Sequence, residues 1–195
     1  MTRIIGGTAR GRRLRTPRGD ATRPTSDRVR EALFSTLESQ LGSLTGLRVL
    51  DLYAGSGAVG LEAVSRGAGV LTAVESDRRT AALVRDNAAA LSFHKIEVLA
   101  VPVARALATH PRAPYDVVFA DPPYVLESAE VEQVLTRLVD QRWVSEGSVV
   151  VVERSARSVE PAWPEGLRRE RVKEYGETVL WYLRAAFGRD QESEE

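Results

Sequence analysis

The chain has 195 residues, with 27 basic and 27 acidic side chains, a formal net charge of zero and no cysteine. This length suits one domain with a sizeable core, and the absence of cysteine excludes disulfides, thiolate metal sites and a cysteine nucleophile. His94 and His110 stand alone, and no apolar run reaches the ~20 residues that span a membrane. We therefore expect a cytoplasmic protein with no metal site.

The net charge conceals an uneven distribution. Residues 1–30 carry nine arginines and two acids, which amounts to +7, and residues 31–195 carry the compensating −7. This division predicts a basic segment that binds a polyanion. The alternative is a solvated segment without a partner, because arginine replaces lysine almost everywhere in this chain.

The first predicted unit is a basic N-terminal extension, residues 1–22. Apolar Ile4, Ile5 and Leu14 flank a glycine-containing stretch and predict two brief strands that form a hairpin. The candidate contacts to nucleic acid are Arg10, Arg12, Arg13, Arg15 and Arg23.

A helix is predicted after the break at Arg23-Pro24-Thr25. Ser26 or Thr25 can cap its N-terminus, where Asp27 suits the positive end of the helix. Glycines at 42 and 46 end it. Its apolar stripe consists of Val29, Leu33, Leu37 and Leu41.

Beyond this helix, short apolar runs alternate with amphipathic helical stretches. This pattern indicates a parallel sheet that is covered on both faces. Two later strands, Leu167–Glu174 and Thr178–Arg184, predict an antiparallel hairpin at one sheet edge. The main domain then covers residues 23–187, followed by an acidic tail, 188–195, that we expect to be disordered. The other predicted strands are 47–52, 70–74, 96–101, 115–120 and 149–152, and the predicted helices begin near residues 58, 77, 103 and 128.

A glycine-rich loop follows the first strand of this sheet. Gly55, Gly57 and Gly60 match G-x-G-x-x-G, in which glycine lets a ligand approach the backbone above a helix N-terminus. Glu75, at the end of the second strand, can accept hydrogen bonds from both ribose hydroxyls of a nucleoside cofactor. The alternative interpretation is a tight turn with a helix-capping acid.

Two cofactors fit such a loop, NAD and S-adenosylmethionine (SAM). Asp51 precedes the glycines, where a dinucleotide site would place a pyrophosphate that the carboxylate repels. The same carboxylate attracts the ammonium and sulfonium groups of SAM. This charge argument points to SAM and disfavours a nicotinamide oxidoreductase.

Asp121-Pro122-Pro123-Tyr124 follows the fourth strand, at the sheet end where open α/β sheets place their sites. The two prolines fix the backbone, so the Asp121 carboxylate and the Pro122 carbonyl can both accept hydrogen bonds from one exocyclic amine. Tyr124 can stack on the base that carries this amine. A rigid loop without a catalytic role is the alternative, but its combination with the glycine loop favours methyl transfer to a base nitrogen.

These two motifs together resemble those of class I SAM-dependent amino-methyltransferases that act on nucleic-acid bases. More narrowly, residues 3–184 look like the bacterial 16S rRNA guanine-N2 methyltransferase family. The resemblance implies an α/β, Rossmann-like fold with a seven-stranded, mostly parallel sheet, a C-terminal antiparallel hairpin and a small N-terminal basic β-hairpin. It is carried by Arg3-Ile4-Ile5-Gly6-Gly7, Gly11-Arg12, Arg23-Pro24-Thr25, Arg30-Glu31-Ala32-Leu33-Phe34 and Tyr175-Gly176-Glu177-Thr178.

The resemblance also implies roles for individual residues. The catalytic set is Asp121, Pro122, Pro123 and Tyr124, which would hold the guanine amine. The SAM contacts would be Asp51, Tyr53, Ala54, Gly55, Ser56, Gly57, Glu75, Ser76, Val103 and Thr25. This chain departs from the family at Val101-Pro102-Val103, where a polar residue is usual, so the backbone near Val103 would replace a side-chain contact to the adenine amine.

The leading hypothesis is methyl transfer from SAM to the exocyclic N2 of a guanine in 16S rRNA, by a monomer that acts on an assembling small ribosomal subunit. Adenine-N6 transfer on DNA or RNA uses the same four-residue motif and is the nearest alternative. A non-catalytic RNA-binding ribosome-assembly factor is the alternative from another class, although Asp121 and Glu75 argue against it.

Overall fold

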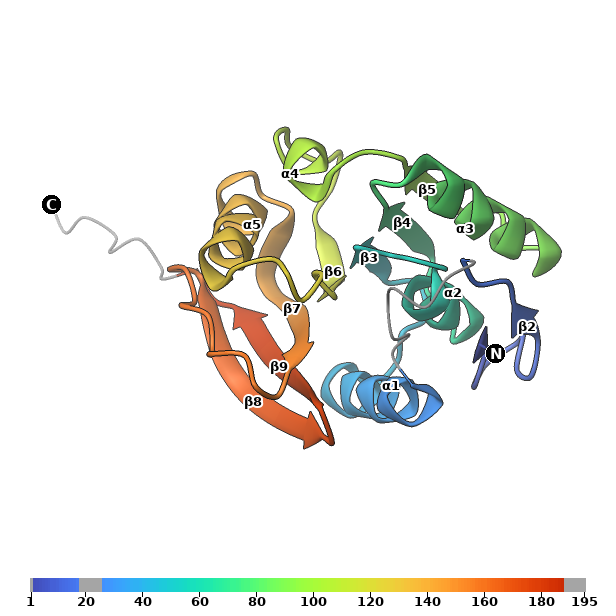
Figure 1. Cartoon of the computed structure of the whole chain (residues 1–195), viewed down its shortest axis with the longest axis horizontal. Coiled ribbons are helices and arrows are strands. Elements are labelled where there is room, and N and C mark those ends of the chain that lie inside the picture. The colour runs from blue at the N-terminus through green and yellow to red at the C-terminus, as the bar shows by residue number, and fades with distance from the viewer. Residues whose placement is uncertain (1, 18–25, 188–195) are drawn as a thin grey trace, which may run out of the picture.

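The computed structural model describes residues 2–17 and 26–187. Its centre is a seven-stranded sheet in the order β5-β4-β3-β6-β7-β9-β8 (Figure 1). The first five strands in this order pair in parallel, and β9 lies antiparallel between β7 and β8. The expected mixed sheet with a C-terminal hairpin is therefore confirmed. The strands are β3 (Arg48–Leu52), β4 (Val70–Val74), β5 (Ile96–Leu99), β6 (Tyr115–Ala120), β7 (Val144–Ser155), β8 (Leu167–Tyr175) and β9 (Thr178–Ala185).

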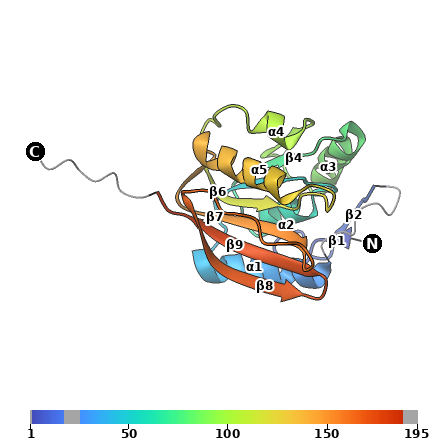
Figure 2. The same ribbon diagram turned by 60° about the vertical axis from the view of Figure 1, so that its left-hand side comes forward.

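Helices cover both faces of this sheet (Figure 2). One core contains residues of α1 (Asp27–Leu41), α2 (Ala58–Ser65) and α3 (Arg78–Ala90), and the other contains residues of α4 (Val103–Ala106) and α5 (Ser128–Asp140). Successive strand residues point to opposite faces: Val117 and Phe119 enter the first core, whereas Val118 and Ala120 enter the second. This two-sided burial explains why the strands read as continuous apolar runs.

The N-terminal segment forms the expected hairpin from β1 (Thr2–Arg3) and β2 (Arg13–Leu14). Ile4 is fully buried in the core of α1 and α2, and the buried Glu62 of α2 accepts hydrogen bonds from Ile5 N and Gly6 N, both at 2.7 Å. The hairpin is thus packed against α1 and α2 of the main domain. The predicted boundary between residues 22 and 23 and the predicted tail 188–195 lie outside the described residues.

Helix α1 begins and ends as its sequence indicates. Ser26 is the N-cap, and its Oγ accepts a hydrogen bond from Val29 N at 3.2 Å. Gly42 follows the last turn with φ = 76°, and its N–H donates to Glu38 O. These two residues satisfy backbone groups that a helix terminus leaves without intrahelical partners.

Some element limits differ from those expected. The strand predicted at 149–152 is the longer β7, because pairing with β9 continues to Ser155. This extension places Glu153 and Arg154 in the sheet, where both are 3% exposed. Strand β5 ends at Leu99, two residues early, and α4 has only four residues.

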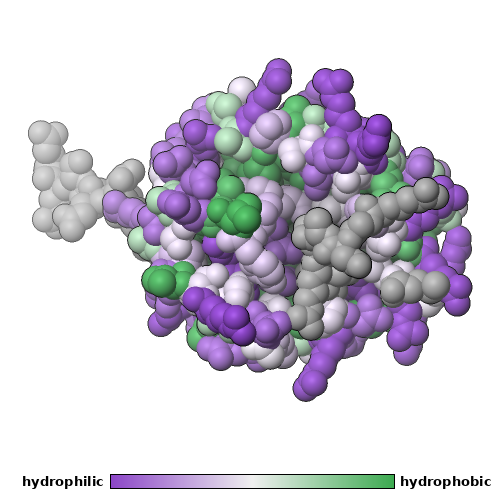
Figure 3. Space-filling view, viewed as in Figure 1, coloured by the Kyte–Doolittle hydropathy of each residue, from purple (hydrophilic) through white to green (hydrophobic). Residues whose placement is uncertain are grey.

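The surface seen in Figure 3 is mostly hydrophilic, with hydrophobic side chains in small groups. Within residues 2–17 and 26–187, no helix is both long enough and apolar enough to cross a bilayer.

Candidate active site

Three neighbouring strands, β3, β4 and β6, end in register at one edge of the sheet, and β7 is paired with β6 there before it continues to Ser155. Leu52 of β3 is paired with Val74 of β4 and Ala120 of β6, and Ala120 is paired with Val152 of β7. The glycine loop and the Asp-Pro-Pro-Tyr loop therefore meet at the carboxyl edge, where open α/β sheets bind ligands. The residues that directly follow the paired positions are Tyr53, Glu75, Asp121 and Glu153.

Glu75 holds the glycine loop through hydrogen bonds. Gly55 N donates to Glu75 Oε2 at 3.0 Å, and Asp77 N donates to Oε1 at 2.9 Å. Ala54 N also donates to Val74 O at 3.0 Å, which ties the loop to the end of β4. Because each carboxylate oxygen has two lone pairs, these bonds leave acceptor capacity. Binding of a ribose by Glu75 stays a prediction.

Two of the three loop glycines are required by packing. Gly57 caps α2 in a left-handed conformation with φ = 77°, and a Cβ there would lie 2.8 Å from Val84 Cγ1. A Cβ on Gly60 would lie 2.9 Å from Asp51 Oδ2 and 2.7 Å from Leu71 Cδ1. Part of the G-x-G-x-x-G pattern therefore serves the close approach of α2 to the sheet.

Asp51 is a buried carboxyl beneath this loop. Its side chain accepts a hydrogen bond from Gly60 N at 2.9 Å, and the residue is 1% exposed. Burial raises its pKa to about 7, assisted by the charge of Glu75 and opposed by the Gly60 hydrogen bond. A carboxylate with such a pKa is stabilised by a nearby cation. Its direct contact with the methionine part of SAM stays a prediction.

The Asp-Pro-Pro-Tyr loop is joined to β3 at its start and presents its end to solvent. Asp121 N donates to Leu52 O at 3.4 Å, and Pro122 is buried. Tyr124 is 55% exposed, which suits a ring that stacks on an incoming base. Burial raises the pKa of Asp121, and the charges of Glu153 and Asp51 raise it further, whereas Arg154 opposes them.

The remaining predicted cofactor contacts lie around these loops. Tyr53, Ala54 and Gly55 are half-buried, Ser56 is buried and Ser76 is exposed. Val103 is a buried residue at the start of α4, directly after Pro102. Thr25 and Arg23 lie outside the described residues. No cluster of three or more side chains able to hold a metal occurs in the part of the chain that the structure describes.

The predicted RNA-binding arginines are exposed on the hairpin and on the segment that follows β2. They are Arg10, Arg12, Arg13 and Arg15. Arg12 Nη2 donates to Ala90 O at 2.7 Å, and Arg15 Nη1 lies 3.9 Å from Asp86 Oδ2. The described part of the basic N-terminal extension (the arm, residues 2–17) therefore lies along α3, and Arg10 and Arg13 are exposed at its surface.

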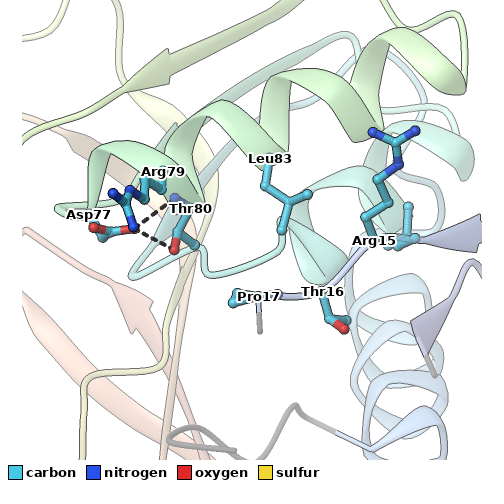
Figure 4. Close-up of a pocket in the computed structure, with 8 residues that line it drawn as sticks. Arg15, Thr16, Pro17, Asp77, Arg79, Thr80 and Leu83 are labelled. Atoms are coloured by element: carbon cyan, nitrogen blue, oxygen red, sulfur yellow. Dashed lines mark hydrogen bonds between the residues drawn. The ribbon is translucent and has the colours of Figure 1, made fainter. Parts of the chain in front are cut away.

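A pocket of about 780 Å³ lies between this arm and the N-terminal half of α3 (Figure 4). Asp77, two residues beyond Glu75, caps α3 through a 2.8 Å hydrogen bond from Thr80 N, so the pocket adjoins the predicted ribose-binding end of β4. Arg15 and Arg79 contribute two positively charged side chains to its lining. The lining residues are Leu14, Arg15, Thr16, Pro17, Asp77, Arg79, Thr80 and Leu83.

Sequence reasoning missed three residues of this region. Glu153 and Arg154 lie in the part of β7 beyond its apolar run, and their burial has no local sequence signal. Asn87 of α3 is 2% exposed and donates to Ser56 O at 3.0 Å. For Asn87 the sequence did contain a signal: a polar residue on the otherwise apolar face of α3 indicates a buried side chain with hydrogen-bond partners.

The chain is similar in sequence and in fold to known proteins. Ribosomal RNA small subunit methyltransferase D of Escherichia coli is 35% identical over 187 residues, covering 95% of this chain and 91% of that protein. The protein of the same name from Haemophilus influenzae is 36% identical, covering 77% of each chain. A solved structure of yhhF, a candidate methyltransferase of Escherichia coli, superposes with a TM-score of 0.83 at 33% identity, covering 95% of this chain and 98% of that one.

A family model extends the likeness to nearly the whole chain. The model described as "Conserved hypothetical protein 95" matches residues 2–184, which include the hairpin, both loops and the C-terminal strands. The chain thus belongs to the Conserved hypothetical protein 95 family.

Proposed function

We propose that this protein transfers the methyl group of SAM to the exocyclic N2 of a guanine in 16S rRNA. One observation carries the proposal: the glycine loop, which Glu75 holds by a hydrogen bond, and the Asp-Pro-Pro-Tyr loop lie together at one edge of the sheet. The coarser activity, SAM-dependent methylation of rRNA, follows from the family and its rRNA methyltransferase members. The base and the atom are the finer part of the proposal.

The residues present fit SAM as the cofactor. The buried carboxyl of Asp51, with its pKa near 7, suits a cationic ligand, and Glu75 retains acceptor capacity for ribose hydroxyls. Tyr53 to Gly57 would line the methionine part, with Ser76 and the backbone near Val103 beside the adenosine. When bound, SAM supplies an electrophilic methyl carbon on a sulfonium.

The chain's own residues would orient the acceptor amine. The Asp121 carboxylate and the Pro122 carbonyl each accept a hydrogen bond from one N–H group of the amine. This directs the nitrogen lone pair away from the loop. Tyr124 holds the base by stacking. The proton leaves the amine after transfer, so no separate general base is required. Orientation of this kind accounts for a large part of the rate enhancement in group transfer.

The arm supports the choice of RNA. Its exposed arginines suit phosphate and can stack on unpaired bases, and one of them, Arg15, lines the pocket that adjoins the end of β4. We place the substrate guanine in an assembling small ribosomal subunit, with the protein acting as a cytoplasmic monomer. The names of the relatives, ribosomal RNA small subunit methyltransferases, support the rRNA substrate.

Nucleotide mapping tests the proposal. The full-length protein is incubated with tritiated SAM and with 16S rRNA, either naked or in immature small subunits, and the modified nucleosides are identified by mass. N2-methylguanosine at one position supports the proposal. N6-methyladenosine would show that the protein is an adenine-N6 methyltransferase instead. If neither form of the RNA were labelled, the non-catalytic assembly factor would be the favoured alternative.

A further inference from the structure

The guanidinium of Arg154 joins β7 to the Asp-Pro-Pro-Tyr loop. Nη1 donates to Pro123 O at 3.1 Å, and Nη2 donates to Leu126 O at 2.6 Å. Both acceptors are main-chain carbonyls of the same loop. The residue is 3% exposed and its Nε has no hydrogen-bond partner, so the two carbonyls are the acceptors that offset part of the cost of burying this charge.

The two carbonyls belong to one tight turn. Leu126 N donates back to Pro123 O at 2.9 Å, which closes a four-residue turn over 123–126. Tyr124 and Val125 are its central residues and are 55% and 89% exposed. Arg154 therefore binds the first and last residues of the turn that presents Tyr124, whereas the two central residues remain exposed to solvent.

The surroundings of Arg154 are acidic. Asp51 and Glu153 are buried carboxyl groups near the same sheet edge as Asp121, and Arg154 is the residue that counters their charge at Asp121. It also lowers the pKa of Tyr53, although burial dominates and leaves that pKa at about 12. One buried cation thus acts on the loop geometry and on the charge of the acceptor carboxylate.

We propose that Arg154 is the positioning residue of the amine-binding loop, holding Pro123 and Leu126 so that Asp121, Pro122 and Tyr124 meet the base in reactive orientation. The proposal rests on the function proposed above. Arginine is needed because its planar fork reaches two carbonyls at once, whereas lysine offers a single point charge. Arg154 touches neither reacting atom, so its effect on the reaction passes through the loop.

Arg154→Met and Arg154→Lys test this role, with Arg184→Met as the matched control. Arg184 lies on the adjacent β9 and also donates to a carbonyl, Gly147 O at 3.0 Å, but it pairs with Val149, five residues before Arg154 on β7. We expect Arg154→Met to lower kcat by about 10²-fold, the loss typical of a misplaced reactive group. SAM binding by calorimetry should stay within about threefold of the wild type, and the control should keep its kcat.

The lysine variant separates charge from geometry. It retains a cation beside Asp121 and Glu153, so the acid limb of its kcat–pH profile should match the wild type while kcat stays low. In Arg154→Met that limb should move to higher pH, because burial and the carboxyls of Glu153 and Asp51 then raise the pKa of Asp121 without an opposing cation. A purely structural role would lower the active fraction without moving this limb.

The outcomes distinguish this proposal from the function on which it rests. An inactive wild-type protein on every RNA would refute the proposed function. An active wild type with Arg154→Met and Arg154→Lys within twofold of its kcat would overturn the positioning role alone. If the methionine variant does not fold, the folded lysine variant decides: unchanged kcat overturns the proposal, and low kcat with normal SAM binding supports it.

Discussion

The side-chain amide of Asn87 pairs with the main chain of Arg15 through two hydrogen bonds of 2.9 Å, one in each direction. The same Nδ2 donates to Ser56 O at 3.0 Å. One buried amide therefore joins the basic arm to the glycine loop, and it uses both of its N–H donors to do so.

Asn87→Ala should loosen both segments. It leaves the Ser56 carbonyl buried without this donor, which costs about 1–3 kcal/mol for a buried polar group. We expect a loss of that size in urea unfolding and faster hydrogen exchange at residues 12–17. Gln133→Ala, which removes an exposed amide from α5, is the control and should change neither. Equal exchange in the Asn87 variant and the wild type would contradict the role of this amide.

Asp121→Ala should abolish methyl transfer while SAM binding persists. The variant lacks the carboxylate that accepts a hydrogen bond from the amine, and the cofactor loop is held separately by Glu75. We expect a loss of at least about 10²-fold in kcat, measured with tritiated SAM, and a calorimetric affinity close to the wild type. Asp121→Asn keeps the shape and one acceptor oxygen, so it should lose less activity than Asp121→Ala. Retained turnover in Asp121→Ala would refute the assigned role.

SAM binding should release protons near neutral pH. Burial raises the pKa of Asp51 to about 7, so about half of the free protein carries a neutral Asp51 at that pH. A cationic ligand favours the carboxylate and lowers the pKa of Asp51. Affinity should therefore rise as pH increases toward 7 and level off above it. Calorimetry in buffers of different ionisation enthalpy measures the released protons, and Asp51→Asn should release fewer; equal release would exclude Asp51 as the source.

Glu75→Gln should weaken SAM binding more than Glu97→Gln does. Glu75 accepts hydrogen bonds from Gly55 N and Asp77 N, whereas Glu97 lies exposed on β5. An amide offers one acceptor oxygen instead of two and has no charge, so the loop and the ribose lose support together. We expect about a tenfold loss of affinity, the factor that corresponds to about 1.4 kcal/mol. Unaltered affinity would show that the ribose is held elsewhere.

Arg10→Ala and Arg13→Ala should weaken RNA binding and flatten its dependence on salt. Each phosphate contact that is lost should reduce the log–log slope by about 0.7–0.9, measured by filter binding between about 50 and 200 mM salt. These substitutions are sharper than deletion of the arm, because deletion would also remove Ile4 from the core. Arg105→Ala on α4 is the control. An unchanged slope would mean that the arm is not the RNA contact.

The local features of the fold and both loops were predictable from the sequence. Strands buried on two faces read as apolar runs, helices repeat their apolar residues every three to four positions, and Ser26 and Gly42 mark the limits of α1. The order of the two loops on their strands was enough to place them at one sheet edge. Each of these signals depends on residues that are close in sequence.

The contacts that brace the site depend on residues far apart in sequence. Asn87 meets Arg15 across 72 positions, and Arg154 meets Pro123 across 31. Such pairs have no periodicity, and a polar residue reads the same whether it faces solvent or lies beneath a loop. The charge balance of the chain is the clearest case: the sequence alone determined that the arginines gather in residues 1–30, and only the tertiary structure decided that the arm packs on α2 and α3 while Arg154 is buried among carboxyls. Burial decides what a charge does because it removes the water that would otherwise screen it.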